Sequence, residues 1–151
     1  MAWRKLTKED LHSALNAAET AGYESAVLAT GQTDLVDKLL IQVTADARSR
    51  IAACSGNILG EADTVPSGVI YRLMPLVIHR LLTRLGLTVK DARNDDWEES
   101  NRWLRDVANC KVTIERPIVD GPAVEQGKYG NAVVVRKGSR KARRSDMEGL
   151  L

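Results

Sequence analysis

Apolar positions of the chain repeat with helical spacing over a long segment from residue 34 to about residue 53. Within it an apolar residue recurs at every fourth position, at Leu35, Leu39, Val43, Ala47 and Ile51. This spacing predicts an amphipathic helix with one wide apolar face. The sequence Ser55-Gly56-Asn57 follows, and we expect the helix to end there because glycine tolerates the left-handed conformation of a helix end.

A second long segment is apolar on most sides and begins at Val65-Pro66. Proline suits the first turn of a helix, where no backbone N–H is needed, and Gly86 is expected to end this helix. Pro75 lies inside it and should kink it, because proline removes one backbone hydrogen bond. We expect the helix to lie at the centre of the core, with four residues largely buried: Leu73, Leu76, Val77 and Leu81.

The N-terminal region carries a helix-start signal. Thr7 is followed three residues later by Asp10, which is the spacing of a capping box. A helix is therefore predicted from this point to about Ala17 or Ala18. The stretch that continues to Gly31 is compatible with a short helix or with a loop.

Towards the C-terminus the pattern changes from helical to extended. Thr88 predicts the start of a fourth helix, which runs to about Asn109. Residues 111–115 and 131–135 then have the composition of strands, and they could pair as a hairpin or add to a neighbour's sheet. Residues 136–151 have no pattern that forms a core, so alone they are predicted to be disordered.

These patterns predict an all-α fold, a small bundle of about four main helices. The bundle forms one helical domain over residues 1–110, and residues 111–151 form an extended C-terminal arm with short β-strands as an option. A chain of 151 residues is long enough to bury a core without disulfides or metal. No apolar run reaches the 18–20 residues or so that span a bilayer, and the start of the chain has no apolar segment of a signal peptide.

Cysteine content points to a reducing compartment. Cys54 and Cys110 are the two cysteines of the chain, and they do not have the spacing of a CxxC motif. The pattern excludes a disulfide framework and a cysteine-based zinc site, and it fits the cytoplasm. Each cysteine falls near a helix end and is expected to be a small buried residue.

Charge is distributed unevenly along the chain. Residues 1–110 carry 13 Lys and Arg against 15 Asp and Glu, a balance of −2, whereas residues 111–151 carry 9 against 5, a balance of +4. Six positive charges gather in nine residues of the arm: Arg136, Lys137, Arg140, Lys141, Arg143 and Arg144. The chain therefore has a nearly neutral body and a basic arm.

Motifs of catalysis are missing from the pattern. His12 and His79 are the two histidines, they lie on different predicted helices, and no nucleophile motif surrounds them. No glycine-rich phosphate loop follows a strand. The acidic residues at 95–99 lack the glycine-containing loop of a calcium site and are expected to pair with arginines of the same helix. We therefore expect no enzyme, and neither catalytic residues, cofactors nor metals.

The order of the helix signals supports a family resemblance. It is carried by an ordered series of motifs over about residues 5–115: Leu6-Thr7-x-x-Asp10-Leu11, Arg50-Ile51, Val65-Pro66, His79-Arg80-Leu81-Leu82, Asp91-x-Arg93 and Trp103-Leu104-x-x-Val107-Ala108-x-Cys110-Lys111. This series resembles the Mu-like group of tailed-phage head–tail connector proteins, also called adaptor or head-completion proteins. In that group a glycine is expected at the position of Cys110.

The resemblance implies a structural role in the virion. Such proteins are small helical bundles that form a ring, usually of twelve copies, beneath the portal protein. The ring extends the DNA channel and offers a docking surface for the stopper or tail-completion protein. The resemblance thus implies the portal protein, neighbouring subunits and the stopper as partners, no catalysis and no membrane, and a location in the virion neck, with assembly in the host cytoplasm.

The arm has more than one interpretation. We expect it to bind the portal or a neighbouring subunit by adding a strand to a sheet edge, while its charges meet an acidic surface. The residues expected to make these contacts are Val133, Val134, Val135, Arg136, Lys137, Arg140, Lys141, Arg143 and Arg144. Alternatively, the charges contact channel DNA without sequence preference, or the chain is a small DNA-binding protein that uses its basic tail. A solvated, solubilising tail is the third interpretation.

Overall fold

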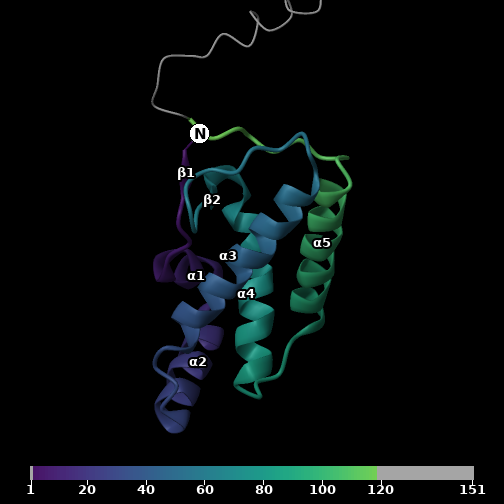
Figure 1. The fold of residues 1–151 in the computed structure, drawn as a ribbon. Coiled ribbons are helices and arrows are strands. Elements are labelled where there is room, and N and C mark those ends of the chain that lie inside the picture. Colours follow the sequence, from purple (N-terminus) through teal and green to yellow (C-terminus); the bar gives the residue numbers. More distant parts are fainter. Residues whose placement is uncertain (1, 119–151) are drawn as a thin grey trace, which may run out of the picture. The chain divides into compact units, whose positions relative to one another are not determined.

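The computed structural model describes residues 2–118, and this part of the chain is a small all-α bundle, as predicted (Figure 1). Residues 119–151 lie outside the described residues, and with them the predicted strand 131–135. The elements in chain order are β1 (Trp3–Arg4), α1 (Lys8–Ala14), α2 (Ala17–Thr30), α3 (Leu35–Ala53), β2 (Val65–Pro66), the 3₁₀ turn η1 (Ser67–Val69), α4 (Ile70–Arg84) and α5 (Asp91–Ala108).

Helices α3, α4 and α5 pack against one another, and α1 packs on α4 (Figure 1). The main apolar cluster is formed by buried residues of α1, α3 and α4 together with Leu104 of α5. All four residues predicted to be buried on α4 are at most 4% exposed: Leu73, Leu76, Val77 and Leu81. The central position of α4 is therefore confirmed.

Helix α3 follows the predicted pattern, but its end differs from the prediction. The five apolar residues of the four-residue repeat are all buried, and the helix ends at Ala53. Gly56 is not in the left-handed conformation. Instead Cys54 is the extended C-cap, and the side-chain amide of Asn57 donates to the carbonyl of Ile51 at 3.0 Å. A side-chain cap thus satisfies a carbonyl at this helix end.

The predicted start of the helix at Val65-Pro66 is wrong. These two residues form strand β2, which pairs antiparallel with β1 so that Trp3 faces Pro66 and Arg4 faces Val65. The helix α4 starts only at Ile70, after the 3₁₀ turn. The pairing partner lies about sixty residues away in the chain, so local sequence did not reveal it.

The C-terminal end of α4 agrees with the prediction. Gly86 has φ 69°, and two hydrogen bonds close the helix: Gly86 N to the Thr83 carbonyl at 3.2 Å and Leu87 N to the Leu82 carbonyl at 2.9 Å. This is a Schellman motif, whose left-handed residue is usually glycine because glycine has no Cβ.

The N-terminal helices are both capped by side chains. Thr7 and Asp10 form the predicted capping box of α1, but α1 ends at Ala14, earlier than predicted. A second capping box, of Asn16 and Glu19, starts α2 at once. The stretch that was compatible with a helix or a loop is therefore a helix.

Helix α5 begins three residues after its predicted start. Lys90, not Thr88, occupies the N-cap position and makes no side-chain cap. The first turn is held by Arg93 instead, whose guanidinium donates to both carboxylate oxygens of Glu19, at 2.8 and 2.6 Å, and to the Ala14 carbonyl at 3.0 Å. The hydrogen bonds from Arg93 lower the pKa of Glu19. One arginine thereby joins α5 to the end of α1 and to the start of α2.

The stability of the protein should fall at acidic pH because of Asp10. Arg4 donates to both of its carboxylate oxygens, at 2.9 and 2.7 Å, and these bonds lower the pKa of Asp10 from 3.8 to about 2. The folded state then keeps the carboxylate ionised at pH values where the unfolded chain already binds a proton. This contribution is complete above about pH 4 and is lost as the pH falls to about 2.

The test is urea unfolding at pH 5 and at pH 2. The loss of unfolding free energy between the two values should be smaller in Asp10→Asn than in the wild-type protein. An equal loss in both proteins would show that Asp10 does not contribute to the acid sensitivity.

Candidate functional site: the root of the C-terminal arm

The nine residues predicted to bind a partner lie outside the described residues: Val133, Val134, Val135, Arg136, Lys137, Arg140, Lys141, Arg143 and Arg144. The structure describes the beginning of the arm, residues 111–118, and we call it the arm root together with the two residues of the turn before it, 109–118 in all. It also describes the body residues that the arm root contacts. The candidate site is therefore the attachment of the arm to the body.

The arm root has no regular secondary structure, so the strand predicted at residues 111–115 is wrong. Ile114 is 5% exposed and forms a second, small apolar cluster with Ile51 of α3 and Val107 of α5. We call these three residues the end cluster. The apolar residues of 111–115 therefore pack on the body, with Ile114 buried and Val112 partly buried, and do not pair in a sheet.

Trp3 of β1 makes a second contact with the arm root. Its indole Nε1 donates to the carbonyl of Glu115 at 3.1 Å. The indole also lies against Gly60, where a Cβ would come within 2.7 Å of the ring. The backbone can approach the ring this closely only because residue 60 has no side chain.

The loop between α3 and β2 is held by Arg48 of α3. Its guanidinium donates to three backbone carbonyls, of Gly60 at 3.2 Å, Glu61 at 2.9 Å and Thr64 at 2.7 Å. It also lies 5.9 Å from the centre of the Trp3 ring. A single α3 residue thus fixes the loop on which Trp3 rests, and Trp3 in turn contacts the arm root.

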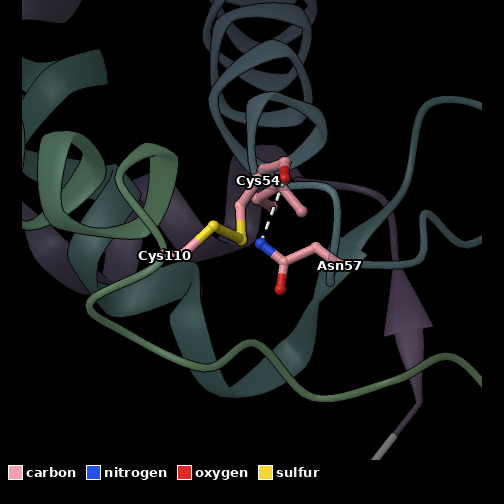
Figure 2. Close-up of a disulfide and its surroundings, with 4 residues drawn as sticks. Cys54, Asn57 and Cys110 are labelled. Atoms are coloured by element: carbon pink, nitrogen blue, oxygen red, sulfur yellow. Dashed lines mark hydrogen bonds between the residues drawn. A yellow bond between two sulfur atoms is a disulfide. The ribbon is translucent and has the colours of Figure 1, made fainter.

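A disulfide bond provides the third contact. Cys54, at the end of α3, is bonded to Cys110, just after α5, with 5.3 Å between the two Cα atoms (Figure 2). The number and spacing of the cysteines predicted no disulfide framework, and this bond shows that the prediction is wrong. The two cysteines meet because α3 and α5 pack side by side with both C-terminal ends together, which a spacing along the chain does not reveal. The expected burial holds for Cys54 at 5% exposed but not for Cys110, which is exposed.

Cys110 occupies a backbone position that favours glycine. Its φ is 60°, and two hydrogen bonds close α5 around it, Cys110 N to the Val107 carbonyl at 3.1 Å and Lys111 N to the Asp106 carbonyl at 2.8 Å. This is the Schellman arrangement seen at the end of α4, with cysteine in the left-handed position. A non-glycine residue there costs roughly 1–3 kcal/mol. The glycine expected from the family resemblance falls on this left-handed position.

Asp96 and Glu99 of α5 are exposed, and the predicted pairing with an arginine of the same helix is confirmed for Asp96 and wrong for Glu99. Glu99 binds Arg72 of α4 at 2.9 Å, whereas Asp96 lies 3.9 Å from Arg93 of its own helix. A shallow groove of about 290 Å³ runs beside these pairs along α4 and α5, and its floor includes Met74 and Ile78. The surface here is a mixture of both charges.

The histidines make aromatic contacts. His79 stacks on Trp97 with ring centres 4.5 Å apart, and His12 lies at a tilt 6.3 Å from Tyr23. Residues 2–118 contain no group of three metal-ligating side chains. None of the described helices has the length and apolar character needed to cross a membrane.

The arm root is therefore joined to the body at three points. These are the disulfide of Cys110 with α3, the burial of Ile114 between α3 and α5, and the hydrogen bond from Trp3 to Glu115. The sequence signal for this site is weak, since Ile114 stands out only as part of a strand-like run. Comparison of the chain with family models, with curated proteins and with solved structures found no match.

Proposed function

We propose that the protein is a structural head–tail adaptor of a tailed bacteriophage. In this function several copies form a ring between the portal and the stopper or tail-completion protein, and the ring extends the DNA channel. The ordered motif series over about residues 5–115 supports the proposal, and so does the small helical body. The observation that carries most weight is the arm root, because a binding arm needs a fixed point of departure from its own body.

The arm is the partner-binding element in this proposal. Residues 133–135 add a strand to a sheet edge of the portal or of a neighbouring subunit, with affinity from backbone hydrogen bonds. The six clustered positive charges steer the arm to an acidic surface. A fixed root limits the volume that the arm searches, which raises its effective concentration near the partner.

Assembly follows from the same arrangement. The body closes its own core, so the free chain is expected to be monomeric at micromolar concentration and to form a ring on the portal. Light scattering of the isolated protein, with and without portal, measures this. A stable ring without portal would contradict the dependence on the partner.

Deletion of residues 132–151 tests the function of the arm. The deletion variant should lose portal binding in a pull-down assay because both the strand and the charges are removed. The matched control keeps the arm but changes its six clustered Lys and Arg residues to Gln. This control should bind portal more weakly and with less dependence on salt, since the strand is still present.

The same two variants also test whether the arm binds DNA. If the charges bind duplex DNA, six neutralised phosphates give a salt slope of about −5, from about −0.9 per contact. Binding of both variants to a DNA duplex is therefore measured over a salt series. The deletion variant decides between the two interpretations. If it still binds portal as the wild-type protein does, but has lost the DNA binding that shows the steep salt dependence, the arm is a DNA-binding tail and does not bind the portal.

A further inference from the structure

The disulfide lies beside the end cluster, at the point where the arm leaves the body. Cys54 follows Ile51 by three residues, Cys110 follows Val107 by three residues, and Ile114 comes four residues after Cys110. Figure 2 shows the bond bridging the end of α3 and the turn after α5. The bond therefore holds together the two helix ends that bury Ile114.

The two cysteines of the bond differ in exposure and in backbone strain. Cys54 is buried, and Cys110 is exposed and held at φ 60°. When the bond is intact, it fixes Cys110 in this unfavourable conformation. Once the bond is broken, two hydrogen bonds at the helix end remain to hold it there, and both involve the amides of residues 110 and 111. Reduction is thus expected to loosen the end of α5 first.

Most of the packing of the body lies away from this bond. The main apolar cluster contains none of the three residues of the end cluster, and the two clusters are linked by the partly buried side chains of Val69 and Trp103. The ion pair of Arg93 with Glu19 joins α5 to α2 at the opposite end of α5 from Cys110. Local release of the arm root can therefore occur while the helices stay packed.

We propose that the Cys54–Cys110 bond is a redox-controlled lock on the arm root. Oxidised, it holds residues 109–118 against the ends of α3 and α5. Reduced, it releases them, so that Ile114 and the start of the arm leave the body while the bundle stays folded. The lock goes beyond the adaptor function and does not require it.

The reduction needs a dithiol as co-reactant. One of its thiolates attacks a sulfur of the bond, forms a mixed disulfide and displaces the other cysteine as a thiolate. The second thiol of the reductant then displaces the first cysteine and closes its own disulfide. Two electrons and two protons pass to the protein, which ends with two thiols.

The experiment compares the isolated full chain in two states. One sample is oxidised with oxidised glutathione and the other is reduced with dithiothreitol, and alkylation with mass measurement counts the thiols in each. Trypsin cleavage after Lys111, followed as the appearance of fragment 1–111, and hydrogen exchange at the amides of residues 110 and 111 report the arm root. Both rates should rise by about tenfold or more on reduction, as expected for release of a local unit. The far-ultraviolet circular dichroism should be the same in the two samples, because the helices stay folded in both.

Two variants separate the bond from the helix end. Cys54→Ser with Cys110→Ser removes the bond and leaves a strained residue at position 110. Cys54→Ser with Cys110→Gly removes the bond but places glycine where φ is positive, which favours the helix end. If the bond is the lock, both variants are cleaved after Lys111 as fast as the reduced wild-type protein, even in the oxidising buffer.

Three results would overturn the lock. The first is two free thiols after oxidation. The second is a Ser/Gly variant that resists cleavage as well as the oxidised wild-type protein, which would mean that the helix end alone fixes the arm root. The third is a loss of helical circular dichroism on reduction, which would mean that the bond holds the whole body folded and not the arm root alone. None of these results depends on a portal protein, so the adaptor function is tested separately.

Discussion

Replacing Leu81 by alanine is expected to lower the free energy of unfolding by about 2–5 kcal/mol. Leu81 of α4 is fully buried and belongs to the main apolar cluster. Helices α1, α3 and α5 all pack against α4. Alanine leaves a cavity that these rigid neighbours fill only in part, so packing contacts are lost in addition to the transfer energy of the missing carbons. The change is measured by urea unfolding, with far-ultraviolet circular dichroism as the probe.

Leu28→Ala is the matched control. It is the same substitution, in helix α2, at a side chain that is 81% exposed. Its effect should stay within about 0.5 kcal/mol, because neither burial nor helix propensity changes much. A loss at Leu28 equal to that at Leu81 would mean that the exposed face of α2 is covered in solution.

Reduction of the disulfide is expected to lower the unfolding free energy by about 4 kcal/mol. The bond joins residues that are 56 positions apart, and closing a loop of this length removes much of the conformational freedom of the unfolded chain. This is an effect on the whole unfolding equilibrium, distinct from the local release of the arm root. Comparison of one wild-type sample with and without dithiothreitol avoids any change of side chain.

The same experiment also measures the slope m, the dependence of the unfolding free energy on urea concentration. The reduced unfolded chain is less restricted and exposes more surface, so the slope m should rise on reduction. An unchanged midpoint together with an unchanged slope would contradict the expected effect of the bond on the unfolded chain.

Long helices were the part of the fold that sequence could predict. Leu39 and Val43 of α3 are four residues apart, and so are Val77 and Leu81 of α4. Each long helix therefore shows its buried face in its own sequence, wherever its packing partner lies. The same holds for the capping box of Thr7 and Asp10, which is a contact across three residues. The capping box of Asn16 and Glu19 has the same signal, and it could have shown the start of α2.

Contacts between distant residues were not predictable in this way. Strand β2 is two residues long and forms because Trp3–Arg4 lies beside it, so it carries no periodicity of its own. Cys54 and Cys110 meet because α3 and α5 end at the same side of the bundle, and a spacing of 56 residues contains no such information. The position of Cys110 had an indirect signal, since the glycine expected there indicated a left-handed residue.

The hydrogen bond between Trp3 and Glu115 spans 112 residues of the chain. During translation, at about 5–20 residues per second, the indole of Trp3 must wait roughly 6–22 s before its acceptor has been synthesised. The helices α1 to α4 can form and pack in that time, whereas the contact that closes the molecule cannot. On the ribosome, Trp3 therefore stays without this partner until residue 115 has been made. Its fluorescence in stalled nascent chains should show a further change when residue 115 has left the exit tunnel, after the change that comes with its contacts to Gly60 and Arg48.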